Sequence, residues 1–267
     1  GEDNVFNYSQ FFFGDLKISM DFLPTFGQDL MKYVIAYLGL TKKCIVLDLD
    51  NTLWGGIVGE DGFNGIKLGP EPPGNAFMEF QRVLLSLHQR GTILAINSKN
   101  NFEDAIKVIK EHPYMILKEE HFASMRINWN DKVSNMKGII KEINIGSDSL
   151  VFIDDDPVNR EFVKSVFPEI LVVNLSDDPS SYVYEIENLI DFSVLKITDE
   201  DKNRGKMYLQ QKKIIELEKT STDLQTFLSQ LNLKIIIKDV DEFTLPRVSQ
   251  LILKTNQFNL TTKRYQE

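Results

Sequence analysis

Two aspartates stand two residues apart in the stretch "IVLDLDNTLW", where an apolar run gives way to turn residues. A buried carboxylate is costly unless a cation or hydrogen-bond donors compensate it, so Asp48 and Asp50 require partners. Three later stretches, "INSKN", "NDK" and "FIDDDP", bring further polar side chains close to apolar runs. Together they offer carboxylates that can attack phosphorus or move a proton, and hydroxyl and ammonium groups that can neutralise phosphoryl oxygens.

The elements that would position these residues follow an alternation of short apolar runs and longer amphipathic stretches from residue 42 onward. Such alternation predicts βαβ units and an α/β fold with a parallel sheet. We expect strands at residues 44–49, 92–97, 115–117, 150–153 and 170–173. We expect helices at residues 26–38, 76–89, 102–111, 132–143 and 158–166. Since open parallel sheets bind ligands beyond the carboxyl ends of their strands, the polar stretches should meet in one crevice.

Four carboxylates, those of Asp48, Asp50, Asp154 and Asp155, are expected in that crevice. They repel one another unless a cation joins them, and an all-oxygen ligand set is what Mg²⁺ prefers. We expect Asp48 and Asp154 to bind Mg²⁺ directly, and Asp155 directly or through water. Asp48 could also attack phosphorus to form an aspartyl phosphate, while Asp50 protonates the leaving oxygen and later activates water.

Ser98 and Lys132 are the expected phosphate-binding residues, since they could hold phosphoryl oxygens and neutralise developing charge. Lys99 lies in the same polar cluster as Ser98, and Thr52 in the same cluster as the first two aspartates; both are further candidates for phosphate binding. Each residue taken alone also has a structural interpretation, because such side chains cap turns and begin helices. Their conjunction, in order and at strand ends or helix starts, favours a site.

The stretches "DLDNTLW", "INSKN", "NDK" and "FIDDDP" resemble, in order, the four motifs of the haloacid dehalogenase-like superfamily, most of whose members are Mg-dependent phosphotransferases. The resemblance implies a Rossmann-like core with a parallel sheet flanked by helices. It implies Asp48 as nucleophile and metal ligand, Asp50 as acid and base with its backbone carbonyl on the metal, and Thr52 as support. It assigns the later motifs to Ser98, to Lys132, and to Asp154 with Asp155.

Longer stretches, among them "VLDLDNTLWGGIVGEDG", "LVFIDDDPVNRE" and "TNQFNLTTKRY", look like the FkbH-like family over nearly everything from residue 42 onward. That family is associated with loading a glyceryl unit from 1,3-bisphosphoglycerate onto an acyl carrier protein. Many of its members carry a C-terminal acetyltransferase-like (GNAT) domain. The resemblance therefore implies a phosphorylated small-molecule substrate and an acyl carrier protein as partner.

Three regions are expected along the chain: an N-terminal helix and linker (1–41), the haloacid dehalogenase-like domain (42–198), and the incomplete start of a GNAT-like α/β unit (199–267). The last should begin with a charged helix at 201–219, followed by a strand at 233–240 and a helix near 246–254. Residues 54–73 and 118–131 are too short to hold a large cap domain, so we expect an open site. The start at Gly1, without methionine, suggests a piece of a longer protein.

Composition excludes several functional classes. The 267 residues carry a net charge of −9 with a pI of about 5.0, and the basic residues are scattered, so a nucleic-acid partner is not expected. Cys44 is the only cysteine, which rules out an intrachain disulfide. No apolar run approaches the roughly 20 residues of a membrane span. A cytoplasmic location is the resulting expectation.

Two other functions remain open at this point. One is a general phosphatase for sugar phosphates or other small metabolites. The other is a non-catalytic phospho-receiver or scaffold, since response regulators also place clustered aspartates, a hydroxyl residue and a lysine on a parallel sheet. Receivers keep their phosphoryl group, so they do not need an acid and base at the position of Asp50.

Overall fold

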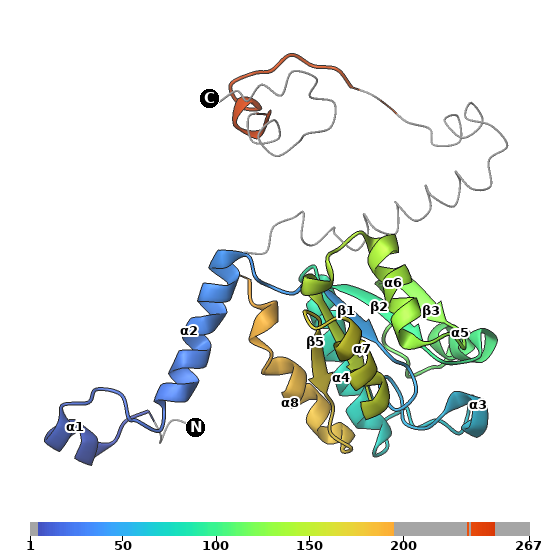
Figure 1. Ribbon diagram of the computed structural model, residues 1–267, viewed down its shortest axis with the longest axis horizontal. Helices are drawn as coiled ribbons and strands as arrows, with labels where there is room; N and C mark the ends of the chain where they lie inside the picture. Colours follow the sequence, from blue (N-terminus) through green and yellow to red (C-terminus); the bar gives the residue numbers. More distant parts are fainter. Residues whose placement is uncertain (1–4, 195–233, 235, 249–267) are drawn as a thin grey trace. The chain divides into compact units, whose positions relative to one another are not determined.

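Five short apolar segments pair into one parallel sheet (Figure 1). The structure, a computed structural model, describes residues 5–194, 234 and 236–248. The strands, in chain order, are β1 (Cys44–Leu47), β2 (Ile93–Ser98), β3 (Phe122–Ile127), β4 (Leu150–Asp154) and β5 (Leu171–Asn174). Their order across the sheet is β3-β2-β1-β4-β5, which places β1 at the centre. The predicted α/β fold with a parallel sheet is thus confirmed.

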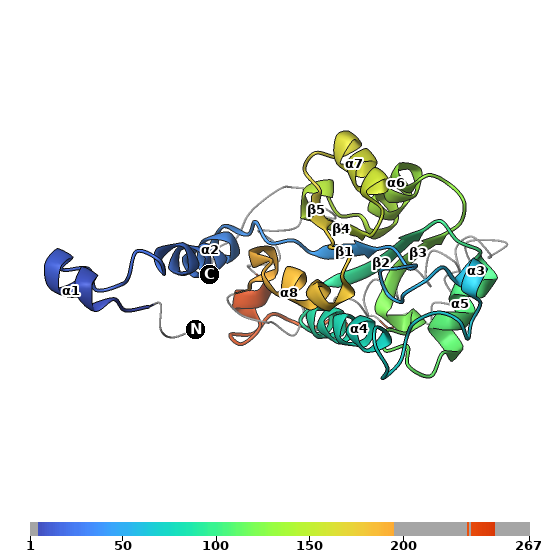
Figure 2. The same ribbon diagram turned by 90° about the horizontal axis from the view of Figure 1, so that it is seen from below.

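Helices cover both faces of the sheet (Figure 2). One face carries α4 (Gly74–Gln89), α5 (Phe102–Glu111) and α8 (Tyr182–Glu187), and the other carries α6 (Lys132–Ile143) and α7 (Pro157–Val166). Alternate side chains of β1 explain this sandwich: Ile45 and Leu47 belong to the first core, Cys44 and Val46 to the second. A central strand buried on both faces is therefore apolar throughout.

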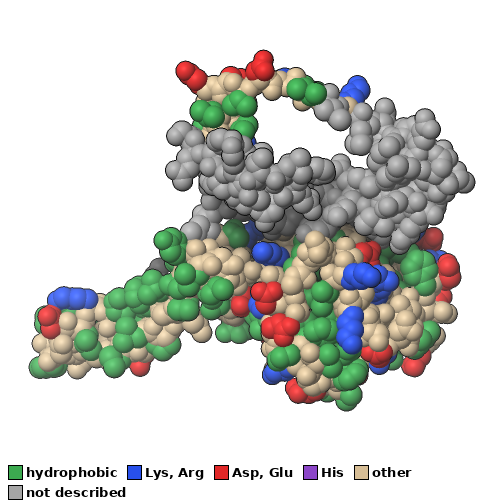
Figure 3. Space-filling view, turned by 45° about the horizontal axis from the view of Figure 1, so that its top comes forward, with side chains coloured by type: hydrophobic (Ala, Val, Ile, Leu, Met, Phe, Trp, Pro, Cys, Tyr) green, Lys and Arg blue, Asp and Glu red, His purple; other side chains and the backbone are tan. Residues whose placement is uncertain are grey.

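Two helices precede the sheet, α1 (Tyr8–Gly14) and α2 (Leu23–Leu38). The predicted helix at 26–38 is confirmed and begins three residues earlier, where Pro24 suits a helical first turn. Neither helix has a buried residue, and hydrophobic side chains such as Phe13 and Tyr37 are exposed along them (Figure 3). Even so, the described part of the chain contains no helix with both the length and the apolar character to cross a bilayer.

The predicted third strand at residues 115–117 is wrong, because β3 lies further along the chain. Met115 and Leu117 in that segment are buried as expected. Its backbone, however, is not in the sheet: Oε1 of Gln81 accepts the N–H groups of Ile116 and Leu117, at 2.9 and 3.1 Å. The true strand escaped prediction because polar residues such as Arg126 interrupt its apolar pattern. The other predicted strands and helices between residues 42 and 194 match within two residues.

The connections at the carboxyl ends of the strands are short. Residues 54–73 form a small flap that contains helix α3 (Val58–Asp61) and is pinned by an antiparallel bridge between Gly55 and Lys67. Only residues 128–131 separate β3 from α6. Within the described residues, these connections therefore form no large cap domain over the carboxyl ends of the strands.

The chain divides into two units, residues 1–213 and 214–267. In the second, residues 245–248 are helical and overlap the start of the predicted helix near 246–254. The predicted strand at 233–240 is wrong where it is described: residue 234 and residues 236–240 form no strand, and Ile237 is 92% exposed. Apolar alternation stabilises a strand only when a neighbouring strand and a core are present. The predicted helix at 201–219 and most of the residues predicted to begin a GNAT-like unit lie outside the described residues.

Candidate active site

The parallel ladder brings the predicted site residues to one edge of the sheet. Leu47, the last residue of β1, pairs with Ile153 of β4, so the next residues, Asp48 and Asp154, lie side by side. The Asp48 N–H extends the ladder by donating to the Ile153 carbonyl at 2.9 Å. Ser98 ends β2, the other neighbour of β1, at the same edge. Strand order and register alone therefore assemble the motif residues of three strands.

Lys132 lies between the two buried carboxylates. Its Nζ is 2.9 Å from Oδ1 of Asp48 and 2.9 Å from Oδ2 of Asp154, and it donates to the Asn97 carbonyl at 2.7 Å. The start of α6 places it there: Asp131 caps the helix by accepting from the N–H of its third residue, and Asn97 donates to the Lys132 carbonyl at 2.8 Å. Burial by itself would lower the pKa of Lys132, but the two carboxylates together raise it. The ammonium therefore stays charged.

The carboxylates of Asp48, Asp154 and Asp155 form a compact group, with one oxygen from each within 4.8 Å of the others. Burial, reinforced by the charge of Asp48, raises the pKa of Asp154 to about 6 against the opposing effect of Lys132. The same two causes raise the pKa of Asp155. Three carboxylates against one ammonium leave two negative charges, which a divalent cation would balance. An all-oxygen group with this charge fits Mg²⁺.

Asp50 lies beyond the strand end and is held by three donors. Its Oδ1 accepts from Nε1 of Trp54 at 2.8 Å and from the Val58 N–H at 3.1 Å, and its Oδ2 accepts from Nδ2 of Asn100 at 2.7 Å. Burial raises the pKa of Asp50 and the charge of Asp48 adds to this, while the three donors oppose it. A raised pKa makes the protonated acid more accessible near neutral pH, as a general acid requires. Because Val58 begins α3, the flap is tied to this carboxylate.

The other predicted phosphate-binding residues differ in their surroundings. Ser98 is buried at the end of β2, and its hydroxyl makes no hydrogen bond within the described residues. Thr52 is fully buried, and its Oγ1 likewise has no partner in the part of the chain that the structure describes. Lys99 is exposed, with its Nζ 3.4 Å from Oδ1 of Asn159. Lys132 contacts carboxylates rather than open space. Phosphate binding by these four side chains stays a prediction.

Sequence reasoning assigned no role to three residues that hold the site together. Asn97, just before Ser98, positions Lys132. Asn100, two residues after Ser98, positions Asp50. Their amides in the quoted stretch "INSKN" were an available signal, since buried amides need partners. Arg160 uses Nη1 to bind the carbonyls of both motif-four aspartates, at 2.8 and 2.7 Å. Its position in α7 provides no comparable signal in the sequence.

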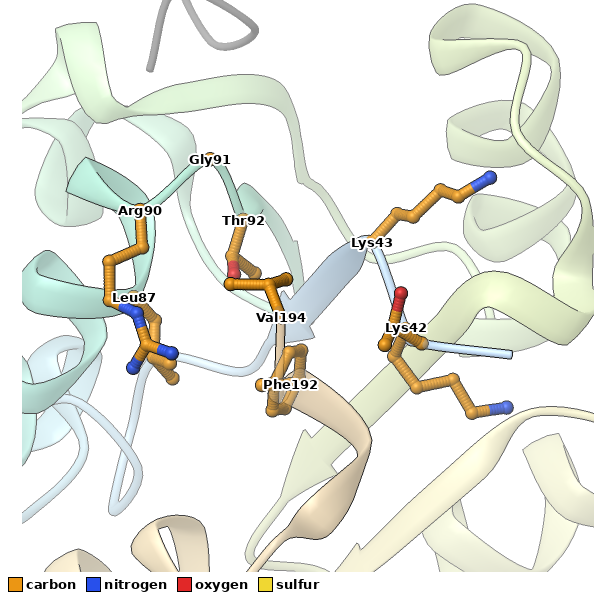
Figure 4. Close-up of a pocket in the computed structure, with 9 residues that line it drawn as sticks. Lys42, Lys43, Leu87, Arg90, Gly91, Thr92, Phe192 and Val194 are labelled. Carbon is orange, nitrogen blue, oxygen red and sulfur yellow. The ribbon is translucent and has the colours of Figure 1, made fainter. Parts of the chain in front are cut away.

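A small cavity at the opposite edge of the sheet does not compete with this site (Figure 4). It has a volume of about 110 Å³ and lies at the amino ends of β1 and β2. The Lys42 ammonium binds the carbonyls of Asp148 and Glu169, and the Lys43 side chain points away from the cavity. Its basic groups therefore do not converge on one point.

Comparison with known proteins finds a solved structure that is similar to this chain. No protein-family profile matches the sequence, and no curated protein matches it. Among solved structures, the chain is similar to the N-terminal part of the protein BF1531 from Bacteroides fragilis, described as containing a phosphatase domain complexed with Mg. The match has 37% sequence identity and a TM-score of 0.69, and it covers 73% of this chain. It spans 52% of the neighbour, so this chain corresponds to about half of that structure's length.

Proposed function

We propose that this chain is a Mg²⁺-dependent phosphatase of the haloacid dehalogenase-like superfamily that works through an aspartyl phosphate on Asp48. The observation that carries the proposal is the buried Lys132 ammonium between Asp48 and Asp154, with Asp155 completing an oxygen-only group. The four-motif resemblance supports it. So does the similarity to a structure that contains a phosphatase domain complexed with Mg.

The free oxygen of Asp48 is the proposed nucleophile. Oδ1 accepts from the Leu49 N–H at 2.8 Å and contacts Lys132, whereas Oδ2 has no hydrogen bond to the described residues. Asp48, Asp154 and Asp155 would hold Mg²⁺, joined by the backbone carbonyl of Asp50 as the resemblance implies. When bound, Mg²⁺ would draw charge from the phosphoryl oxygens and shield them from the carboxylates.

In the first step, Asp48 attacks phosphorus, the bond from phosphorus to the ester oxygen breaks, and protonated Asp50 gives its proton to that oxygen. In the second, Asp50 takes a proton from water as the water attacks the aspartyl phosphate. The bond between phosphorus and Asp48 then breaks, which releases phosphate and restores both aspartates. Ser98, Lys99 and Lys132 are the proposed contacts of the phosphoryl group, and Thr52 supports the loop that carries the aspartates.

The proposed substrate is a phosphorylated glycerate, and its turnover is coupled to transfer of the glyceryl unit to an acyl carrier protein. The FkbH-like resemblance is the basis for both. The small flap and the absence of a large cap over the described sheet edge support a substrate presented by a partner. An enclosed site would admit only a free small molecule.

Phosphate release from a panel of phosphorylated metabolites tests this proposal. The panel includes phosphoglycerates, acyl phosphates and sugar phosphates, assayed with Mg²⁺ or EDTA and with or without a carrier protein. Asp48→Asn should lower the rate by on the order of 10³-fold or more while leaving the circular dichroism spectrum unchanged. Asp177→Asn, the same change at an exposed aspartate, is the matched control and should retain full activity.

The panel also separates the alternatives. Preference for glycerate phosphates supports the carrier-linked substrate, and broad turnover without such preference supports a general metabolite phosphatase. A long-lived aspartyl phosphate without turnover supports a receiver or scaffold. Wild-type rates in the Asp48→Asn protein would refute the nucleophile.

A further inference from the structure

The indole of Trp54 is buried at the base of the flap, where it bonds to the Asp50 carboxylate. Trp54 is 0% exposed and belongs to the same core as the inner side chains of α4. Its backbone forms a bridge with Asp50, and the next residue, Gly55, pairs with Lys67 through hydrogen bonds of 3.0 and 2.7 Å. A Cβ atom at Gly55 would lie 2.9 Å from the Phe77 ring, so the chain packs directly on α4 here. The indole is therefore held in a fixed position.

Hydrogen bonds distinguish the two oxygens of the Asp50 carboxylate. Oδ1 accepts from Nε1 of Trp54 at 2.8 Å and from the Val58 N–H at 3.1 Å, and these two donors occupy both of its lone pairs. Oδ2 accepts from Nδ2 of Asn100 at 2.7 Å, and no other donor reaches it from the described residues. One lone pair of Oδ2 is therefore left for a proton. Asp50 is also partly exposed, as a group that meets a substrate must be.

We propose that Trp54 is a positioning residue that fixes Oδ1 of Asp50 and so leaves Oδ2 as the oxygen that gives and takes the proton. This inference rests on the proposed function, because it takes Asp50 as the acid and base. In the first step the proton passes from Oδ2 to the ester oxygen as the bond from that oxygen to phosphorus breaks. In the second step Oδ2 takes a proton from the attacking water. Proton transfer depends on a held geometry, whereas packing alone requires only that the buried indole N–H find an acceptor.

Leaving-group dependence is the direct readout, because kcat/KM reports the reaction up to departure of the leaving group. Trp54→Phe keeps an aromatic ring and removes the N–H donor. For phosphoglycerate, whose alkoxide leaving group needs a proton, kcat/KM should fall by about 10-fold or more. For p-nitrophenyl phosphate, whose leaving group departs without a proton, kcat/KM should change by less than about 2-fold.

Three controls separate this effect from a loss of folding or of phosphate binding. Inorganic phosphate should inhibit Trp54→Phe and wild type with the same inhibition constant. Trp129→Phe is the same change at a tryptophan that is 74% exposed, and it should keep wild-type kinetics. If Trp54→Phe does not fold, benzothienylalanine in place of Trp54, in the Trp129→Phe protein, is the second variant. It keeps the shape of the indole and replaces only the N–H with sulfur, so it should show the same leaving-group dependence.

A double-mutant cycle with Asp50→Asn completes the test. With Asp50→Asn already present, Trp54→Phe should cause no further loss of kcat/KM for phosphoglycerate, because the acid that Trp54 positions is gone. Unchanged kinetics in Trp54→Phe, equal losses on both substrates, or additive losses in the double mutant would overturn the inference, while phosphate release by the wild type would still support the proposed function. A wild-type protein that releases phosphate from neither ester would overturn both.

Discussion

Removal of the Lys132 ammonium is the sharpest perturbation that this site allows. Lys132→Met keeps an unbranched side chain of similar length and deletes the charge between Asp48 and Asp154. Both carboxylates would then face each other at the strand edge with no cation between them. The Asn97 carbonyl would also lose its 2.7 Å bond.

The expected loss of stability follows from burial. Lys132 is 1% exposed, and the side chain of Asp154 is fully buried, so solvent screens this interaction little. Removing one partner of a buried ion pair costs about 3–5 kcal/mol. For a domain of roughly 150–250 residues this corresponds to a fall in Tm of roughly 6–20 °C.

Thermal unfolding followed by circular dichroism, at pH 8 in EDTA, measures this loss. Lys99→Met is the matched control, since Lys99 is exposed and its ammonium is 3.4 Å from Oδ1 of Asn159. The free energy of unfolding of this variant should change by less than about 0.5 kcal/mol. In Lys132→Met, Mg²⁺ should restore part of the stability, because the cation replaces the missing charge. A Lys132→Met protein within about 1 kcal/mol of wild type in EDTA would refute the reasoning.

Three further predictions concern single side chains. Asn100→Ala removes the 2.7 Å hydrogen bond to Asp50. Because a hydrogen bond to a charged group is worth about 1.5–3 kcal/mol, kcat at saturating Mg²⁺ should fall about tenfold or more. An unchanged kcat would contradict the positioning role of Asn100. Gln81→Leu leaves the Leu53 carbonyl and two backbone N–H groups without their hydrogen-bond partner. The free energy of unfolding, measured in urea, should fall by about 3 kcal/mol, whereas Gln89→Leu at an exposed position should change it negligibly. Burial lowers the pKa of His88, so the folded state favours the neutral ring. The neutral His88 ring therefore makes its full contribution to the free energy of unfolding above about pH 6.5. This contribution is lost as the pH falls below that value, because the unfolded state then binds a proton more readily. Unfolding free energies at pH 7.5 and 5.5 should therefore differ more for wild type than for His88→Gln, and equal differences would refute the assignment.

The sequence by itself determined which side chains would share one edge of the sheet. Four of the five strands were predictable because apolar runs alternate with amphipathic stretches, and parallel strands bring all their carboxyl ends to the same side. Asp48 and Asp154 had to lie together once β1 and β4 were neighbours. The exception was β3, because its polar residues interrupt the apolar pattern of a strand. The segment at 115–117, whose backbone is held by Gln81, has an apolar pattern typical of a strand but is not one.

Tertiary structure decided which partner each buried polar group found. Nothing in the local sequence predicts that Lys132 bridges two carboxylates, that Arg160 binds two carbonyls at the end of β4, or that the Tyr182 hydroxyl bonds to the Asn51 carbonyl across 131 residues. Local propensity acts over a few residues, whereas a buried donor or acceptor must be satisfied by whichever group packing brings within about 3 Å. Those long-range contacts hold the proposed catalytic and metal-binding groups in position.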